Sequence, residues 1–185
     1  MYLLGFHDES GISEKPTVRR TWSVKGKTPI IQSTGSWTTM SLSGTIVCTV
    51  KGNNPKLFLK SLSHNIKFPD VITYLKELKK HLKRKKLLLF WDGLSAHKAK
   101  DTITYLKTQK HWLKVERLPA YAPELNPPEY LWSAMKNKHL CNLRPKGLPV
   151  LKAAVSKSYR KIRNDRGLLQ SFLRASGLYG EQYLT

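Results

Sequence analysis

Acidic residues are scarce in this chain of 185 residues, which has 12 Asp and Glu against 33 Lys and Arg. The formal net charge is therefore 33 − 12 = +21. An excess this large indicates a nucleic-acid partner, because phosphate backbones attract dense positive charge. An anionic membrane surface is the weaker alternative, since no expected helix pairs a basic face with an inserted Trp or Phe face. We expect nucleic acid as the partner and no membrane.

Several other features are missing. Cys48 and Cys141 stand alone, without CxxC or zinc spacing, which argues against a disulfide framework and suits a reducing compartment. No apolar run approaches the length of a membrane span. Met1 leads straight into a strand-like run, without the charged region and cleavage site of a signal peptide. The chain also lacks a Gly-rich phosphate loop, a Ser-His-Asp pattern and a Cys nucleophile with a paired His, so the common nucleotide-binding and hydrolase classes are disfavoured.

The first half of the chain is rich in β-branched residues and turn signals, which predict strands. We expect a hairpin around the turn at residues 25–27. Residues 37–50 predict two strands or one long bent strand, with Gly44 as a break or a bulge. The expected strands cover residues 2–8, 20–24, 30–32, 37–50 and 57–59.

The second half alternates helical and strand patterns. Its continuous apolar run at 87–91 is typical of a buried central strand, and we place that strand beside the first one. The order of elements predicts one α/β domain built on a mixed sheet, an antiparallel meander plus parallel strands, flanked by helices. The expected helices cover about 69–84, 95–106, 127–139, 151–162 and 169–173, and the expected strands cover 87–91 and 112–118.

Three acids occupy distinctive places. Asp8 and Asp92 each end an apolar strand, so both should lie at the rim of the sheet where ligands collect. Glu129 begins a helix after Asn126 and Pro127. Each has an ordinary alternative: Asp8 a turn, Asp92 an Asp-Gly hairpin, and Glu129 a capping box with Asn126 as N-cap. The capping role is compatible with metal binding, because the helix dipole favours the ionised carboxylate. Three such carboxylates predict hard divalent cations and chemistry on a polyanion.

Other polar residues are weaker candidates. Glu9, Glu116 and Glu124 compete for an acidic role. His97 follows Asp92 by five residues, and either a surface position or a role at substrate phosphate or in the outer shell of the metal site would suit it. Lys136 shares a helical face with Glu129 and could neutralise phosphate, although a solvated lysine is equally compatible with the pattern. The candidate DNA contacts are Lys25, Lys27, His97, Lys98 and Lys136.

The chain contains four distinctive blocks in order, at residues 6–11, 21–29, 91–98 and 118–133. Together these blocks resemble the catalytic domain of DDE transposases of the insertion-sequence and mariner superfamily. The resemblance covers about residues 2–140, and 36 residues separate Asp92 from Glu129, which fits the short second spacing of the family. One departure is Pro128, where the family has an aliphatic residue; proline is tolerated in a first helical turn.

The resemblance implies a ribonuclease-H-like fold in which Asp8, Asp92 and Glu129 bind two Mg²⁺ ions, with Mn²⁺ as a substitute. It implies phosphodiester hydrolysis at transposon ends, followed by strand transfer by a DNA 3′-hydroxyl. The partners would be double-stranded DNA and a second copy of the chain, in a prokaryotic cytoplasm and nucleoid or a eukaryotic nucleus. We expect residues 1–143 to form the catalytic domain and 144–185 a basic helical extension packed on it or continuous with it.

Two questions stay open at this stage. Family members carry an N-terminal helix-turn-helix region, whereas this chain starts at the first catalytic strand. A separate helix-turn-helix domain or frame, a truncation and a decayed copy are all compatible with this start. The alternative functions are another ribonuclease-H-like nuclease, such as a junction resolvase or an RNA–DNA hybrid nuclease, and a decayed DNA-binding remnant.

Overall fold

A five-stranded mixed sheet with the strand order β3-β2-β1-β4-β5 forms the centre of the molecule. The computed structural model describes residues 2–15, 17–27, 30, 38–119 and 122–179. The first three strands form an antiparallel meander, and the last two run parallel to β1. The predicted mixed sheet is therefore confirmed. The strands are β1 (Tyr2–Ser13), β2 (Thr39–Cys48), β3 (Lys56–Leu62), β4 (Lys86–Trp91) and β5 (Leu113–Arg117).

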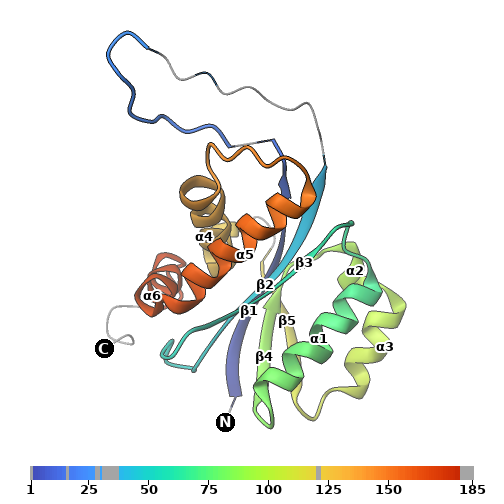
Figure 1. The fold of residues 1–185 in the computed structure, drawn as a ribbon. Helices are drawn as coiled ribbons and strands as arrows, with labels where there is room; N and C mark the ends of the chain where they lie inside the picture. Colours follow the sequence, from blue (N-terminus) through green and yellow to red (C-terminus); the bar gives the residue numbers. More distant parts are fainter. Residues whose placement is uncertain (1, 16, 28–29, 31–37, 120–121, 180–185) are drawn as a thin grey trace.

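Helices cover the two faces of this sheet in two groups (Figure 1). The first group is α1 (Phe68–Leu82), α2 (Ser95–Lys98) and α3 (Lys100–Thr108). The second group is α4 (Pro127–Ala134), its π-helical continuation η2 (Met135–His139), α5 (Leu148–Asn164) and α6 (Arg166–Ala175). A short 3-10 turn, η1 (Pro123–Leu125), precedes α4. Within the described part of the chain, no helix is both long and apolar enough to cross a membrane.

Alternation along the strands builds a separate core on each face of the sheet. Leu87 and Leu89 of β4 point to the first group of helices and pack in one core with Leu75 of α1. Phe6 of β1 points to the other face and packs with Leu131 of α4. All of these side chains are buried. Because successive residues of β1 alternate between the two cores, its polar residues are also divided between the two faces.

The C-terminal helices belong to the second core. Leu151 and Ile162 of α5 and Leu169 of α6 are almost fully buried in the cluster that contains Phe6. At roughly 1.5–3 kcal/mol for each fully buried leucine or isoleucine, these contacts tie α5 and α6 firmly to the sheet. Helices α5 and α6 therefore pack on the same face of the sheet as α4, mainly against β3 and α4.

Several expectations for the first half need correction. The first strand does not end at Asp8, since β1 continues to Ser13 by pairing with β2. Of the two alternatives for this segment, the described residues 38–50 contain a single strand, β2. Gly44 pairs in regular register with Asp8 and Leu59, so the strand has no bulge there. The predicted hairpin is wrong for residues 20–24, which form no strand. Its second half, 30–32, lies largely outside the described residues.

Two helix expectations also change. The predicted helix 95–106 is broken at Ala99, whose ψ of 141° interrupts it between α2 and α3. Ser95 is the first helical residue of α2. The helix expected from Pro127 to His139 is confirmed, although its second half is π-helical. The two prolines at its start occupy the first turn, where a missing N–H removes no helical hydrogen bond.

Candidate active site

Asp8 and Asp92 meet at the same level of two adjacent parallel strands. Phe6 of β1 pairs with Phe90 of β4, so two further residues along each chain bring Asp8 opposite Asp92. Carboxylate oxygens of Asp8, Glu9 and Asp92 all lie within 4.8 Å of one another. The predicted convergence of the two aspartates is therefore observed, although it occurs in the middle of β1 and at the end of β4.

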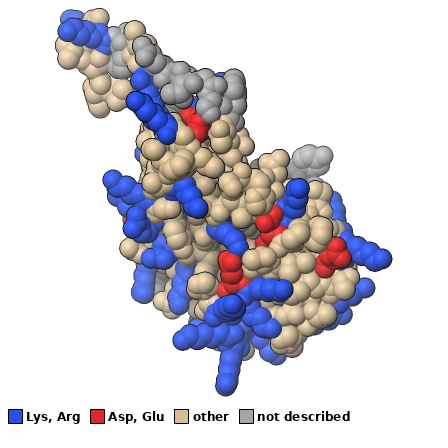
Figure 2. Space-filling view, turned by 45° about the vertical axis from the view of Figure 1, so that its right-hand side comes forward, with Lys and Arg blue, Asp and Glu red and all other residues tan. Residues whose placement is uncertain are grey.

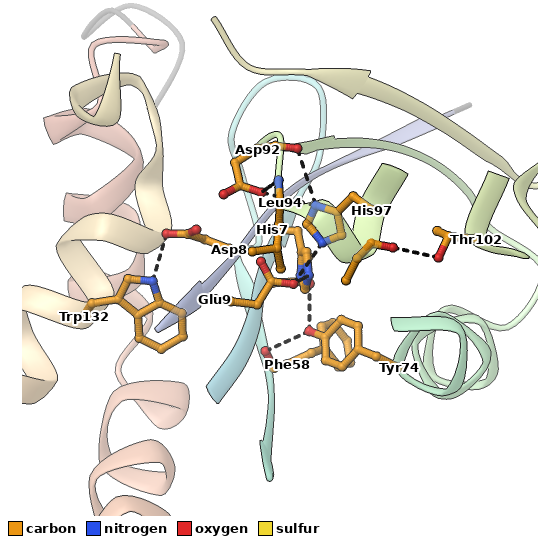
Figure 3. A network of polar contacts seen from close by, with 12 residues as sticks. His7, Asp8, Glu9, Phe58, Tyr74, Asp92, Leu94, His97, Thr102 and Trp132 are labelled. Carbon is orange, nitrogen blue, oxygen red and sulfur yellow. Dashed lines mark hydrogen bonds and ion pairs between the residues drawn. The ribbon is translucent and has the colours of Figure 1, made fainter. Parts of the chain in front are cut away.

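Asp8 is a buried carboxylate that faces α4. The indole Nε1 of Trp132 donates a hydrogen bond of 2.9 Å to its Oδ2 atom (Figure 3). Burial, and to a smaller extent the nearby charge of Glu129, raise the pKa of Asp8 to about 6 even though the Trp132 hydrogen bond acts to lower it. An ionised Asp8 therefore lacks a compensating cation among the described protein groups that contact it.

Gly44 makes room for this contact. It pairs with Asp8 across the β1–β2 ladder, and the Trp132 ring lies against it. A Cβ atom at position 44 would stand only 2.6 Å from Cη2 of Trp132. A glycine is needed here because the indole approaches the strand backbone closely. The Trp132 contact is thus set by a residue on β2 as well as by α4.

Glu129 stands in the first turn of α4 with an exposed side chain. It lies on α4, the same helix whose Trp132 contacts Asp8, and its charge acts on that carboxylate. It is not part of the three-carboxylate group within 4.8 Å. The predicted capping box is wrong: the side chain of Asn126 makes no cap hydrogen bond, and its Oδ1 atom is buried without a partner among the described residues.

Asp92 is held in place by its own loop. Its Oδ1 atom accepts a hydrogen bond of 3.0 Å from the backbone N–H of Leu94 and lies 3.1 Å from His97 Nδ1. The side chain is 47% exposed, so one face of it is open to a ligand. The hydrogen bond from His97 is the main reason that the pKa of Asp92 is lowered. Asp92 is thus an oriented, ionised carboxylate.

Behind Asp92 lies a buried chain of polar side chains (Figure 3). The Oε1 atom of Glu9 is 2.9 Å from Nε2 of His97 and 2.9 Å from Nε2 of His7. The His97 ring also stacks on Trp91, with ring centroids 4.0 Å apart. Beyond His7 the chain continues through hydroxyl groups, from His7 Nδ1 to Thr45 Oγ1 at 2.9 Å and then to the Tyr74 hydroxyl at 2.7 Å.

The histidine and carboxylate charges in this row of polar side chains stabilise one another. Burial alone would lower the pKa of His97, but hydrogen bonds to Asp92 and Glu9 raise it to about 9. Burial would raise the pKa of Glu9, but His7 and His97 together hold it well below its usual range. A charged His97 between two carboxylates donates from both ring nitrogens. It therefore fixes Asp92 without being free to act on substrate.

Glu9 is the residue whose role the sequence did not reveal, since it ranked only as a competitor of the three acids. Side chains alternate along a strand, so His7 and Glu9 lie on the same face and Asp8 on the other. This two-residue spacing is the sequence signal that indicates a contact between His7 and Glu9. Its Oε2 atom is buried without a hydrogen-bond partner among the described residues. That orphaned oxygen, the unneutralised Asp8 and the oxygen-rich donor set together fit a hard divalent cation.

The candidate DNA contacts fall into three groups. Lys136 Nζ donates to Ser10 Oγ at 2.7 Å, beside the Asp8 face of β1. Lys98 Nζ would lie 3.3 Å from a Cβ atom added to Gly93, the residue that follows Asp92. Lys25 and Lys27 are exposed on the segment 17–27, which extends away from the sheet (Figure 1). The side chain of His97 is 1% exposed and both its nitrogens face carboxylates, so a direct phosphate contact does not fit it.

Known proteins share this architecture. The structure of the Mos1 mariner paired-end complex with Mn matches with a TM-score of 0.70 at 17% identity, over 97% of this chain and 53% of that chain. The Mos1 strand transfer complex matches with a TM-score of 0.61 at 17% identity, over 96% and 56% of the two chains. The Mos1 transposase catalytic domain with raltegravir and Mg matches with a TM-score of 0.51 at 16% identity, over 96% and 85%.

These structures show that the fold is ribonuclease-H-like, as the sequence predicted. The chain spans about half the length of the Mos1 transposases in the DNA complexes. No curated protein matches the sequence significantly. The family described as DDE superfamily endonuclease matches residues 4–151, which include Asp8, Asp92 and Glu129. The chain therefore belongs to the DDE superfamily of endonucleases.

Proposed function

We propose that this chain is the catalytic domain of a DNA transposase, which cleaves a phosphodiester at transposon ends and joins the resulting 3′-hydroxyl to target DNA. The observation that carries the proposal is the meeting of Asp8 and Asp92 on adjacent parallel strands of a DDE endonuclease fold. The fold relatives include Mos1 in paired-end and strand transfer complexes. The net charge of +21 supports DNA as the substrate.

Asp8, Asp92 and Glu129 are the residues that we propose as metal ligands. Divalent metal fits the site, and the relatives include Mos1 structures with Mg and with Mn. We propose two Mg²⁺ ions, which Mn²⁺ can replace. When bound, the ions would polarise the attacking oxygen and neutralise charge on the leaving oxygen. Glu129 is exposed and free of a capping bond, so its carboxylate can turn toward Asp8.

The chain's own groups orient this site. Trp132 holds one oxygen of Asp8, and Leu94 and His97 hold one oxygen of Asp92. Each aspartate thereby keeps its second oxygen for the ligand. Such second contacts to ligating carboxylates commonly change metal affinity or activity by about 10- to 100-fold. Lys98 and Lys136, beside the two aspartates, would attract the phosphates that flank the reacting one.

The wider assembly follows the same proposal. The chain would act as a homodimer on double-stranded DNA, with a separate helix-turn-helix domain or frame to recognise the transposon ends. Residues 1–143 would form the catalytic domain, and 144–185 would stabilise it, because α5 and α6 pack in the Phe6 core. Its compartment would be the nucleoid of a prokaryote or the nucleus of a eukaryote.

Strand transfer separates this proposal from its alternatives. Purified chain would be incubated with Mg²⁺, a supercoiled plasmid and short duplexes that carry a pre-cut 3′-hydroxyl end. We expect both nicking and covalent joining of the labelled duplex to the plasmid. Nicking without any joined product would favour another ribonuclease-H-like nuclease. A chain that binds the plasmid but leaves it intact in Mg²⁺ and Mn²⁺ would be a DNA-binding remnant.

A further inference from the structure

A second feature lies at the end of the sheet away from the carboxylates. A hollow of about 810 Å³ opens there between the start of β1, the loop that joins β2 to β3 and the turn that joins α1 to β4. A neighbouring hollow of about 470 Å³ shares Lys56 and Arg166 with it. Leu3 lines the hollow and Asp8 lies five residues further along β1, which is roughly 16 Å at the rise of a strand.

Basic residues from the start of β3, the turn after α1 and the corner between α5 and α6 line these two hollows, which together are called the rear groove. Each of the six cations is exposed, and among the described residues that line the groove none is acidic. Within the described ranges, none of the six forms a salt bridge. They are Lys56, Lys83, Arg84, Lys85, Arg163 and Arg166. Lys and Arg also gather at the lower end of the surface in Figure 2, where α1 meets β4.

Two of these cations stand where local structure disfavours them. The turn after α1 is closed by a hydrogen bond of 3.2 Å from Lys85 N–H to Leu82 O. Lys83, at its second position, has φ 56° and ψ −120°, a conformation that glycine adopts with far less strain. Arg166 is the first residue of α6, where the helix dipole disfavours a positive charge. Folding alone therefore does not explain the choice of residues in the rear groove.

We propose that the rear groove binds the phosphate backbone of a nucleic-acid duplex, at a site separate from the duplex that the carboxylates would cut. Unpaired cations repel one another, and a polyanion that enters the groove relieves this repulsion and releases its own counterions. A concave surface fits the convex backbone of a duplex better than a flat bilayer. The described residues of the lining also include none of the Trp side chains that anchor membrane-surface proteins.

The matched test compares two triple variants of equal net charge. The groove variant carries Lys83→Gly, Arg84→Gln and Arg166→Gln. The control variant carries Lys107→Gln, Lys110→Gln and Lys152→Gln, which are exposed residues outside the rear groove. Binding of a short mixed-sequence duplex would be followed by fluorescence anisotropy over a range of salt, without divalent metal. The readout thus does not depend on the proposed cleavage activity.

We expect the groove variant to bind the duplex about tenfold or more weakly than wild type at moderate salt. The slope of the logarithm of its binding constant against the logarithm of salt concentration should become shallower by about 0.9 for each lost phosphate contact. The control variant should lose much less affinity. The melting temperature of the groove variant should stay equal or rise, because Lys83→Gly relieves backbone strain. Equal losses in the two variants would mean that only net charge matters, which would overturn the proposal.

Lysine acylation locates the contact directly. With wild-type protein, the duplex should protect Lys56, Lys83 and Lys85 from an acylating reagent, as read by mass spectrometry, and should leave Lys107 and Lys110 reactive. Protection of the first three lysines by anionic phospholipid vesicles but not by duplex would assign the groove to a membrane and contradict the proposal. Loss of nicking with protection intact would count against the proposed function alone.

Discussion

His97 lies between two carboxylates, with Nδ1 3.1 Å from Asp92 Oδ1 and Nε2 2.9 Å from Glu9 Oε1. This arrangement makes Glu9 a positioning residue for Asp92, although 83 positions separate the two acids in the chain (92 − 9). The relationship explains how a half-exposed aspartate in a loop keeps one orientation. It also gives the site a buried support that can be tested separately from the ligands.

Replacement of Glu9 by Gln should raise the Mg²⁺ concentration needed for half-maximal nicking and lower the nicking rate about 10- to 100-fold. The amide removes the anion that keeps His97 charged, so Asp92 loses its fixed donor. The measurement is a Mg²⁺ titration of plasmid nicking. Glu77→Gln is the control, because Glu77 is an exposed acid that pairs with Lys60 far along α1. A Glu9 variant with unchanged Mg²⁺ dependence would show that the network does not position Asp92.

Gly44→Ala should destabilise the protein by about 1–3 kcal/mol, because the new methyl group would stand 2.6 Å from the Trp132 ring. The displaced indole would also lose its hydrogen bond to Asp8. Denaturant unfolding measures the change in the free energy of unfolding. Gly11→Ala is the matched control on β1, since no described residue has an atom within 4 Å of a Cβ at that position. Equal stability of the two variants would contradict the close approach of Trp132 to the strand.

Asp8→Asn should stabilise the metal-free protein at pH 8. The pKa of Asp8 is raised from 3.8 to about 6, so the folded state holds the proton more tightly than the unfolded chain. The stability that Asp8 contributes is fully present below pH 3.8 and is lost as the pH rises through about 6. The difference of about 2 pKa units corresponds to about 3 kcal/mol as an upper value.

Unfolding measured in EDTA at pH 4 and at pH 8 tests this direction of the pH dependence. The stability advantage of the Asp8→Asn variant over the wild type should be large at pH 8 and nearly absent at pH 4. Addition of Mg²⁺ at pH 8 should raise the melting temperature of the wild type more than that of Asp8→Asn, since only the former offers a carboxylate to the ion. An Asp8→Asn protein that is less stable than wild type in EDTA at pH 8 would contradict the buried, unneutralised carboxylate.

The main elements and the three acids could be predicted from the sequence because each leaves a local pattern. Apolar runs precede Asp8 and Asp92, and an Asn-Pro-Pro start precedes Glu129. The end of β1 could not be predicted, because residues 9–13 have the composition of a turn and become a strand only through pairing with β2. Local propensity is overridden here by tertiary pairing.

The contacts that support the three acids could not be predicted from local sequence patterns, for a similar reason. Glu9 meets His97 across 88 positions, and Trp132 meets Asp8 across 124. Gly44 resembles a break in a strand, whereas its actual reason is an indole from a helix far along the chain. The capping expectation for Glu129 failed because the Asn126 side chain turns into the protein and not toward the helix. Such contacts depend on the packing of distant elements.

The most direct test of the metal-dependent active site is plasmid nicking by wild type and Asp92→Asn side by side in Mg²⁺, with duplex binding measured on the same samples. We predict nicking by the wild type, none by Asp92→Asn and equal duplex affinity for both, because the substitution removes one ligand carboxylate and no phosphate contact. Nicking by Asp92→Asn at the wild-type rate would contradict the assignment of the three carboxylates.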